Sequence, residues 1–384
     1  MLRTSLQDLP ASRIRELANV GLGRDDVVKF WFGEGDLPTP DFIRAAAKDS
    51  LDAGETFYAS NLGLPELRAA IAAYVSRLHG TRIGEERIVV TSSGVNALAL
   101  TCQSLIDPGD RVVVVTPVWP NLTSIPRLMN AQVTRVPLSC TDGCFELDLD
   151  RLLEAAAGAR MVIVNSPGNP TGWTMAQPQW DALLASCRRR GTWLLADDAY
   201  ERLVYDGSMH APSVIGQVGA EDRYVSANTF SKAWTMTGWR LGWVVAPSPL
   251  VGEFAKIVEF NTSCAPVFVQ RAALAALAAG EAPIQATVAR LRAARDRLVG
   301  NLQRIPGVEV ASPPGAMYAF LRIRGRSEDS FACAKALVEE AGLGLAPGIA
   351  FGAEGEGWLR WCFAATTELL DEGVARLRGW LGSR

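Results

Sequence analysis

Arg223-Tyr-Val-Ser-Ala-Asn-Thr-Phe-Ser-Lys-Ala-Trp-Thr-Met-Thr-Gly-Trp-Arg-Leu-Gly-Trp-Val-Val-Ala246 is the stretch that decides how the central sheet is arranged. Its two ends, Arg223–Ala227 and Leu241–Ala246, are apolar enough to form buried strands. The loop between them leaves little room for a crossover helix, which parallel neighbouring strands require. The second strand is therefore predicted to run antiparallel to most of the sheet.

The loop of this stretch carries a lone lysine, Lys232. A lysine between two apolar strands must be paired or neutralised if it is buried. The hydroxyls of Thr229 and Ser231, with Arg240 nearby, suit an anion such as a phosphate. A lysine beside a phosphate site indicates an amine that forms a Schiff base with an aldehyde cofactor. The alternative is a surface loop with an incidental lysine.

Apolar runs alternate with helical patterns through the rest of the chain up to this stretch. This rhythm is typical of a mostly parallel sheet that helices cover on both faces. The predicted strands are Val27–Phe32, Ile88–Val90, Arg111–Val115, Gln132–Pro137, Met161–Val164 and Thr192–Ala196. The predicted helices are Ala11–Val20, Phe42–Ala53, one that begins near Pro65, Ala97–Leu105, Leu149–Ala157 and Gln177–Arg190.

The last third of the chain has a different pattern, which predicts a smaller α+β unit. Its expected strands lie near Val308 and at Met317–Ile323 and Trp358–Phe363, and its helices at Phe331–Ala341 and Glu368–Leu381. A chain of 384 residues is longer than one core usually serves. We therefore expect an α/β fold with a large ligand-binding domain over 41–285. Residues 1–40 and 286–384 would form the smaller domain, with the junction in the Ala-rich helical pattern Ala282–Ile305.

Composition excludes several classes of function. The chain is 48% hydrophobic and 21% charged with a net charge of −3, so charge gives no reason to expect nucleic acid or a membrane surface as partner. No apolar run approaches the length of a transmembrane helix, and the N-terminus lacks an apolar signal core. Seven scattered cysteines favour reduced thiols and a cytoplasmic location.

Histidine and metal chemistry are not expected. His79 and His210 are the two histidines, and neither lies in a zinc or triad motif. We interpret both as ordinary surface residues and predict no metal site. No phosphate-binding P-loop occurs either.

Two strand-to-helix turns carry candidate binding residues, because ligands bind at the carboxyl ends of parallel strands. Thr91-Ser-Ser-Gly-Val95 could hold a phosphate at a helix N-terminus, although a plain helix cap explains it as well. Asn165-Ser-Pro-Gly-Asn-Pro-Thr-Gly172 is more specific. Its prolines and glycines constrain the loop so that Asn169 is held rigidly.

Four further residues could bind a cofactor or substrate, and three of them also have a structural interpretation. Asp197 follows an apolar strand, where a buried carboxylate needs a cation such as a protonated pyridine; the alternative is a helix cap. Tyr200 could bond a phenolic oxygen of the same ring. Trp119 could stack on an aromatic cofactor or belong to the core. Arg360, among aromatic residues, suits a carboxylate or an exposed strand face.

These stretches, in this order, resemble the class I/II aminotransferases of fold type I, which use pyridoxal 5′-phosphate. The resemblance extends from Gly33 to Thr366. Its most specific motifs are Asn169-Pro-Thr-Gly172, Asp197-x-x-Tyr200 and Ser231-Lys-x-x-x-x-Thr-Gly-Trp-Arg240, and it also covers Tyr58-Ala, Gly63, Leu67-Arg68, Pro314-Gly-Ala-x-Tyr318 and Pro347-Gly-x-x-Phe351.

The resemblance implies a role for each matched residue. Lys232 would form the internal aldimine, Asp197 would bind the pyridine nitrogen, and Tyr200 and Asn169 would contact the ring oxygen. Trp119 would stack on the ring. The phosphate cup would comprise Ser93, Gly94, Val95, Thr229, Ser231 and Arg240. Tyr58 would reach the phosphate of the other subunit in a homodimer with shared sites. Arg360 would clamp the substrate α-carboxylate, and Gly33 would line the same pocket.

The reaction expected from this resemblance is transfer of an amino group between an L-amino acid and a 2-oxo acid, through aldimine, quinonoid and ketimine. Two alternatives stay open. A lyase or cyclase, for example a β-eliminating enzyme, starts from the same external aldimine. A regulator that binds pyridoxal 5′-phosphate without turnover is a third reading, against which the full catalytic set weighs. No cation for a dicarboxylate side chain stands out, although Trp31, Phe32 and Cys264–Phe268 could line an apolar pocket.

Overall fold

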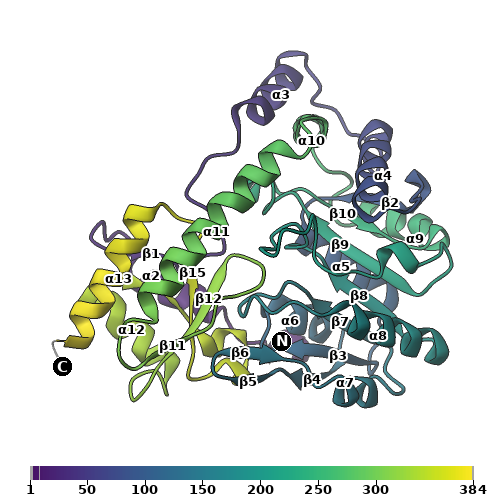
Figure 1. Cartoon of the computed structure of the whole chain (residues 1–384). Coiled ribbons are helices and arrows are strands. Elements are labelled where there is room, and N and C mark those ends of the chain that lie inside the picture. Colours follow the sequence, from purple (N-terminus) through teal and green to yellow (C-terminus); the bar gives the residue numbers. More distant parts are fainter. Residues whose placement is uncertain (1–2, 8, 383–384) are drawn as a thin grey trace.

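A seven-stranded sheet forms the centre of the larger part of the molecule in this computed structural model, which describes residues 3–7 and 9–382 (Figure 1). The strand order is β2-β10-β9-β8-β7-β3-β4. The strands are β2 (Ile88–Thr91), β3 (Arg111–Thr116), β4 (Gln132–Pro137), β7 (Met161–Asn165), β8 (Trp193–Asp197), β9 (Tyr224–Thr229) and β10 (Gly242–Val245). Strand β10 runs antiparallel to both β2 and β9, and the other neighbours are parallel. The predicted antiparallel strand is confirmed.

Helices cover both faces of this sheet, which explains why its strands are apolar along their whole length. Val112 and Val114 of β3 pack with α5 (Gly94–Leu105), α6 (Asn121–Leu128) and α9 (Ser248–Glu259). Val113 and Val115 point to the opposite core, because successive side chains of a strand alternate between faces. That second core is built with α3 (Asp41–Asp52), α4 (Pro65–His79), α7 (Leu149–Ala155), α8 (Gln177–Arg190) and α10 (Val267–Ala278).

Local signals set the ends of these helices. Helix α4 begins with Pro65, whose fixed φ suits the first turn, and ends at Gly80 with φ of 61°. Helix α8 spans the predicted residues Gln177–Arg190 and stops at Gly191, again with positive φ. Glycine at these stops avoids the steric penalty that a side chain would incur in the left-handed region.

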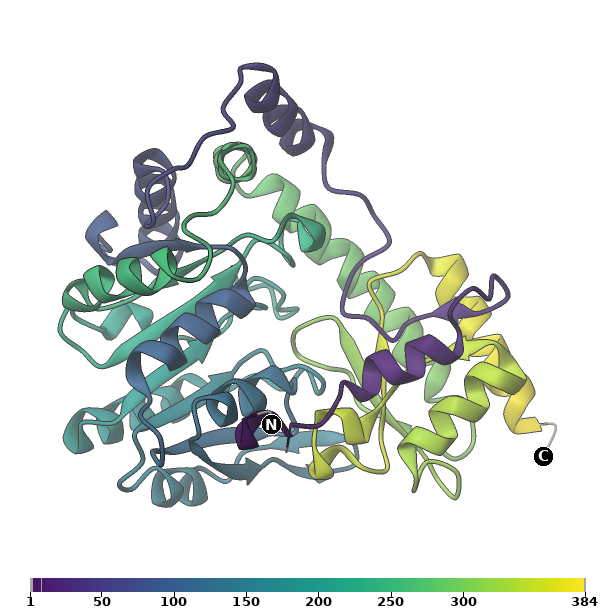
Figure 2. The same cartoon turned by 180° about the vertical axis from the view of Figure 1, so that it is seen from behind.

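The smaller part is built on the four-stranded antiparallel sheet β11-β12-β15-β14. The N-terminal segment joins it, because β1 pairs with β13 and α2 packs against it (Figure 2). The predicted strand over Val27–Phe32 is reduced to the two residues of β1. The elements are α2 (Arg13–Val20), β1 (Val28–Lys29), β11 (Val308–Val310), β12 (Tyr318–Ile323), α12 (Ser330–Ala341), β13 (Leu343–Gly344), β14 (Ala346–Pro347), β15 (Leu359–Cys362) and α13 (Thr367–Gly382).

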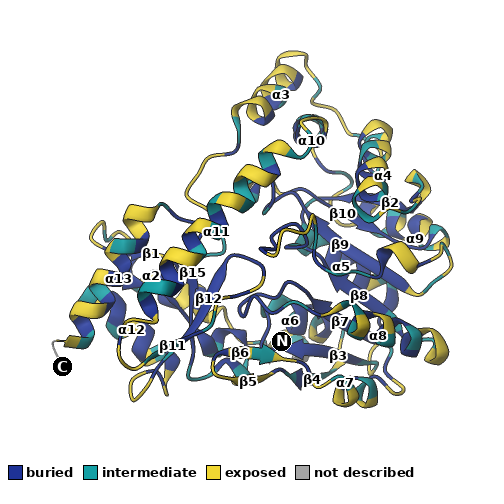
Figure 3. Cartoon of the chain, viewed as in Figure 1, coloured by how far each residue is buried: buried dark blue, intermediate teal, exposed yellow. Residues whose placement is uncertain are grey.

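Helix α11 (Ala282–Leu302) runs from the larger to the smaller part (Figure 1). Ile284 near its start belongs to a core of the large sheet, whereas Leu291 and Leu298 belong to the core of the small one. Its outer face is largely exposed (Figure 3). The helix ends three residues before the predicted Ile305.

Some elements were not predicted from sequence. They are α1 (Thr4–Gln7), α6, β13, β14, the hairpin of β5 (Ser139–Thr141) and β6 (Cys144–Glu146), and the 3-10 turns Glu85–Arg87, Ile215–Gln217, Thr237–Trp239, Gly348–Phe351 and Ala353–Gly355. All seven cysteines are free thiols.

Among the described residues, no single helix is long and apolar enough to cross a membrane. Helices α10 and α11 reach that length and apolarity only when they are taken together, and they are bent by 82° relative to each other.

The interpretation of both histidines as surface residues is wrong for His79. Its side chain is only 4% exposed and lies with Nε2 3.3 Å from the carboxylate of Glu201. Its ring centroid is 4.4 Å from that of His210. The position of His79 in the sequence did not indicate that it would pair with His210. The pair forms only because the segment after β8 packs on the end of α4. Within residues 3–7 and 9–382, no cluster of three metal-ligating side chains occurs.

Candidate active site

A cavity of about 440 Å³ lies at the carboxyl ends of the parallel strands, between the large sheet and the small one. Side chains from both sheets and from the N-terminal segment line it. All the sequence-predicted site residues line it except Ser93 and Tyr58; those present are Gly33, Gly94, Val95, Trp119, Asn169, Asp197, Tyr200, Thr229, Ser231, Lys232, Arg240 and Arg360. Residues separated by more than 300 positions in the chain thus meet in one hollow.

Lys232 extends into this cavity from the loop after β9. Its ammonium group donates to the carbonyl of Gly33 over 2.5 Å, and it lies 5.7 Å from the centre of the Tyr200 ring. Burial lowers the pKa of Lys232 to about 8, and the neighbouring Arg360 acts in the same direction. About a tenth of the side chain is therefore a neutral amine at pH 7, which is the nucleophilic form and far more than at the ordinary lysine pKa of 10.5.

Asp197 is the last residue of β8 and is 5% exposed. Burial raises the pKa of its carboxyl group to about 7, and this effect exceeds the opposing ones of the Ala199 amide and Lys232. The Ala199 N–H donates to the carboxylate over 3.3 Å. The Asn165 side chain donates over 3.0 Å to the backbone carbonyl of Asp197 and ties β8 to the next strand. With a pKa of about 7 the carboxyl group is only about half ionised at pH 7, and a cation beside it in the cavity would favour the ionised form.

Two tyrosines form a buried pair beside Lys232. The hydroxyl oxygens of Tyr200 and Tyr318 are 2.7 Å apart, and their rings meet edge to face. Burial raises the pKa of both hydroxyls well above their ordinary range, so both stay protonated at physiological pH. The pair can therefore donate a hydrogen bond to an oxygen in the cavity.

Arg360 reaches the cavity from β15 and is 2% exposed. It donates to the Asn169 side-chain oxygen over 3.0 Å and to the carbonyl of Trp31. Its guanidinium lies 4.5 Å from the centre of the Tyr318 ring, and its buried Nε atom has no partner in the described chain. The interpretation as an exposed strand face is wrong, because Asn169, Tyr318 and Phe351 enclose the side chain. An unpartnered guanidinium N–H favours binding of a carboxylate.

The turn between β2 and α5 presents the positive end of a helix to the cavity. The Ser93 hydroxyl accepts from the backbone N–H of Asn96 over 3.0 Å, so Ser93 is the helix cap. A side chain on Gly94 would lie 3.0 Å from Thr229, so glycine permits this close approach. Thr229 in turn donates to the Ser231 hydroxyl over 2.9 Å. Hydroxyls and the helix end thus lie together, as an anion site requires.

Trp119 and Arg240 complete the lining at the two edges of the cavity. The Trp119 backbone N–H donates to the carbonyl of Asn169 over 2.8 Å, which joins the two loops. Arg240 is exposed, has φ of 55°, and donates to the carbonyl of Thr237 over 2.7 Å. It lines the same cavity as Gly94 at the start of α5.

The model of the family "aminotransferase class I and II" matches residues 26–377 of the chain. The chain belongs to this family. Its members use pyridoxal 5′-phosphate.

Individual relatives of this aminotransferase agree over nearly its whole length. An aspartate aminotransferase of Pyrococcus horikoshii is 33% identical over 369 residues, which are 95% of this chain and 93% of the relative. An arginine–pyruvate transaminase of Pseudomonas aeruginosa is 32% identical over 364 residues, covering 94% and 92%. A solved structure of a single mutant of Thermus thermophilus aspartate aminotransferase superposes with a TM-score of 0.91 at 30% identity, and the match covers 99% of both chains. The fold is that of aspartate aminotransferase.

The cavity of this aminotransferase fits the cofactor of its family. Asp197 is a buried carboxylate that needs a cation, as the protonated pyridine nitrogen would be. Lys232 is a partly neutral amine in the same hollow. The helix end at Gly94 with the hydroxyls of Thr229 and Ser231 suits the phosphate. The three features lie in one cavity, as the three ends of a single molecule would require.

Sequence reasoning missed several cavity residues of the aminotransferase. Tyr318 was part of a matched motif without a role, and its place at the start of β12 next to Arg360 could not be read from spacing. Ser12 and Arg15 of the N-terminal segment also line the cavity. An amphipathic helix at the chain start was the available signal, but it did not reveal that α2 packs at the cavity.

Tyr58 lies outside this cavity and is 90% exposed within the chain. The neighbouring Phe57 is 84% exposed. Two adjacent exposed aromatic side chains are unusual for a solvated loop. The exposure of Tyr58 is compatible with the expectation that it acts on a second subunit.

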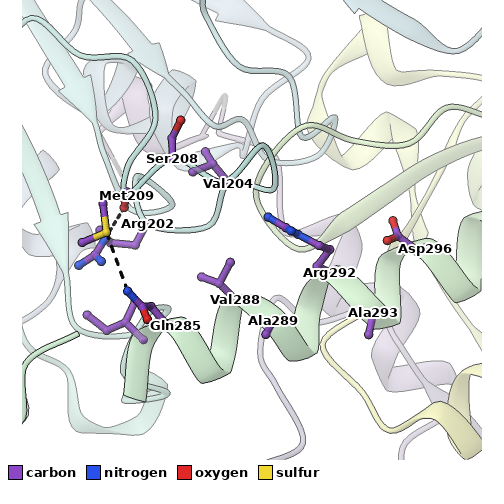
Figure 4. Close-up of a pocket in the computed structure, with 12 residues that line it drawn as sticks. Arg202, Val204, Ser208, Met209, Gln285, Val288, Ala289, Arg292, Ala293 and Asp296 are labelled. Atoms are coloured by element: carbon purple, nitrogen blue, oxygen red, sulfur yellow. Dashed lines mark hydrogen bonds between the residues drawn. The ribbon is translucent and has the colours of Figure 1, made fainter. Parts of the chain in front are cut away.

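A second hollow of about 440 Å³ lies between α11 and the segment after Tyr200 (Figure 4). Gln285 on α11 approaches the sulfur of Met209 over 4.0 Å. Arg202 at its edge is buried and already paired with Glu281 and the Tyr74 hydroxyl. This hollow is lined by none of the predicted site residues.

Proposed function

We propose that this aminotransferase exchanges the amino group of an L-amino acid with a 2-oxo acid in the cavity around Lys232. The observation that carries the proposal is the grouping of a partly neutral lysine, a buried carboxylate and a buried arginine with an unpartnered N–H in one hollow. Pyridoxal 5′-phosphate, when bound, supplies a reactive aldehyde and a ring that withdraws electrons.

Each side chain would hold one part of the cofactor. Lys232 would hold the aldehyde carbon and Asp197 the proton on the ring nitrogen, since a buried carboxylate favours a cation beside it. Tyr200 and Asn169 would donate to the ring oxygen, and Trp119 would stack on the ring. The phosphate would bind at Ser93, Gly94, Val95, Thr229, Ser231 and Arg240, and at Tyr58 of a second subunit.

Arg360 would bind the α-carboxylate of the amino acid with Gly33 beside it. Two N–H groups of a guanidinium fix a carboxylate in one plane, which orients the α-carbon toward Lys232. The Lys232 amine then removes the proton from that carbon as a general base. Its pKa of about 8 is close to the working pH, and this suits a group that must both accept and release a proton.

The substrate side chain stays a matter for experiment, because the named relatives act on different amino acids. We test the function with a panel of L-amino acids, using pyruvate and 2-oxoglutarate as acceptors, with keto acid and ammonia measured together. Transamination predicts keto acid that depends on the acceptor. Ammonia released without an acceptor would instead identify the lyase alternative.

Lys232→Ala is the decisive variant. It should lose the visible absorption of the bound cofactor and the transfer activity. Lys256→Ala is the matched control, because Lys256 is 68% exposed and paired with Glu253 on α9. A normal visible absorption in Lys232→Ala would refute the assignment.

We further propose that the enzyme is a homodimer in which Tyr58 serves the partner's site. Its exposure supports this. Mixing inactive Tyr58→Ala and Lys232→Ala subunits should restore about a quarter of the wild-type sites, because one site of each mixed dimer carries no substitution. No recovery after verified subunit exchange would contradict a shared site.

We also propose the domain limits 41–285 for the large cofactor-binding domain, with 1–40 and 286–384 forming the small one. The cores support this division: Ile43 and Ile284 belong to the large-sheet cores, whereas Ile14 and Leu291 belong to the small-sheet core. Free thiols support a reducing compartment, and we propose the cytoplasm.

A further inference from the structure

Tyr318 contacts three residues of the proposed machinery although no role has been assigned to it. It is fully buried at the start of β12. Its hydroxyl is 2.7 Å from that of Tyr200, and its ring lies 4.5 Å below the Arg360 guanidinium. Its hydroxyl also abuts Gly33, where an added Cβ would lie 2.2 Å from it. One side chain therefore joins the residues proposed for the ring oxygen, for the carboxylate and for the Lys232 contact.

The two hydroxyls have two protons between them and one mutual hydrogen bond. Among the described residues, each has the other as its hydrogen-bond partner. One proton fills the contact, and the second is available to the cavity. If Tyr200 is to donate to a ring oxygen, Tyr318 must donate to Tyr200. A donor whose own oxygen accepts a hydrogen bond is polarised and becomes a stronger donor.

The ring of Tyr318 has a separate effect on Arg360. A guanidinium over an aromatic face is attracted to that face by the ring quadrupole, and the Arg360 guanidinium lies over the Tyr318 ring. Phe351 lies 4.9 Å from the same guanidinium, so two rings border it. The direction in which Arg360 presents its N–H groups thus depends on Tyr318 as well as on the Asn169 hydrogen bond.

We propose that Tyr318 is a positioning residue that directs the proton of the Tyr200 hydroxyl into the cavity and holds the plane of the Arg360 guanidinium. This rests on the proposed function of Tyr200 and Arg360. The hydroxyl performs the first task and the ring performs the second, so the two can be separated by substitution.

Tyr318→Phe removes the hydroxyl and keeps the ring. We expect the pH midpoint of the visible absorption of the cofactor-loaded enzyme to rise by about half a unit to one unit, as loss of one hydrogen bond implies. The midpoint rises because a weaker donor leaves more negative charge on the ring oxygen, and the nitrogen joined to Lys232 then keeps its proton to higher pH. The KM for the best amino acid of the panel should change less than about twofold, because the ring still faces Arg360.

Tyr318→Leu removes ring and hydroxyl together. We expect the same rise in midpoint and, in addition, an increase of about fivefold in KM from loss of the cation–π contact. Tyr205→Phe is the matched control. Tyr205 is also buried, donates its hydroxyl to the carbonyl of Ala316 and stacks with Arg295 at 4.5 Å, but it does not line the cavity. It should change neither value.

An unchanged midpoint in Tyr318→Phe would overturn the role of the hydroxyl. An equal KM increase in the Phe and Leu variants would overturn the role of the ring. If Tyr318→Leu fails to fold, as thermal unfolding would reveal, the Phe variant still decides the proposal through its midpoint. Absence of visible absorption in the wild-type enzyme loaded with pyridoxal 5′-phosphate would refute the proposed function instead.

Discussion

Replacement of Asp197 by Asn tests whether the buried carboxylate destabilises the cofactor-free fold while it supports cofactor binding. The carboxyl group is 5% exposed, and burial raises its pKa to about 7 from an ordinary 3.8. The folded protein therefore binds the proton more tightly than the unfolded chain does. The contribution of Asp197 to the free energy of unfolding is fully present below pH 3.8. It is lost as the pH rises through 7, because the ionised carboxylate is disfavoured in the fold.

The magnitude follows from the pKa difference. The change from 3.8 to about 7 spans about 3 pH units. At about 1.4 kcal/mol per unit, this is about 4 kcal/mol at pH 8. Burying an asparagine amide in the same place also costs free energy, which offsets part of this difference. We therefore expect cofactor-free Asp197→Asn to be about 1–2 kcal/mol more stable than wild type at pH 8, and less than about half of that at pH 5.

The assay is urea unfolding of both cofactor-free proteins at the two pH values. Asn keeps the shape of the side chain and can still accept from the Ala199 N–H. With cofactor bound, the variant should lose turnover by at least about a hundredfold, since no anion then holds the ring nitrogen proton. Asp198→Asn is the matched control: Asp198 is also buried with a raised pKa, but it accepts from Ser226 and does not line the cavity.

Two results would refute the reasoning. Wild-type turnover in Asp197→Asn would show that Asp197 is not the partner of the ring nitrogen. A lower free energy of unfolding for Asp197→Asn than for wild type at pH 8 would show that burial of the charge is not what dominates the effect of this substitution. A hundredfold loss of turnover in Asp198→Asn as well would show that the effect is not specific to the cavity.

Two further predictions concern packing and pH. Gly33→Ala places a methyl group 2.2 Å from the Tyr318 hydroxyl, so we expect a loss of about 1–3 kcal/mol in urea unfolding. Adding Tyr318→Phe should restore part of it, and no recovery would contradict the clash. The Nδ1 atom of His210 donates to the Ala211 carbonyl, and burial lowers the pKa of the imidazole. The contribution of His210 to the free energy of unfolding is therefore present above pH 6.5 and is lost as the pH falls below that value. His210→Gln should therefore lose less thermal stability than wild type between pH 7.5 and 5, and equal losses measured by calorimetry would contradict this.

Most strands and helices were predictable because the spacing of apolar residues along a stretch shows whether one or both of its faces are buried. Strand β4 and helix α8 have the predicted bounds, Gln132–Pro137 and Gln177–Arg190. The direction of β10 followed from the shortness of the loop before it, since no crossover fits there. The candidate residues at the ends of β8 and β9 followed from the rule that ligands bind at carboxyl ends of parallel strands.

The sequence by itself therefore determined the family, the elements and the types of residue at the strand ends. Only the tertiary structure decided which of them touch: Arg360 with Asn169, 191 positions away, and Tyr318 with Tyr200, 118 positions away. It also decided that the His79 side chain is buried and that α2 reaches the cavity. Periodicity reports which face of an element is buried, whereas partners depend on how distant elements pack together. That packing depends on contacts along the whole chain, so it cannot be deduced from any single stretch of sequence.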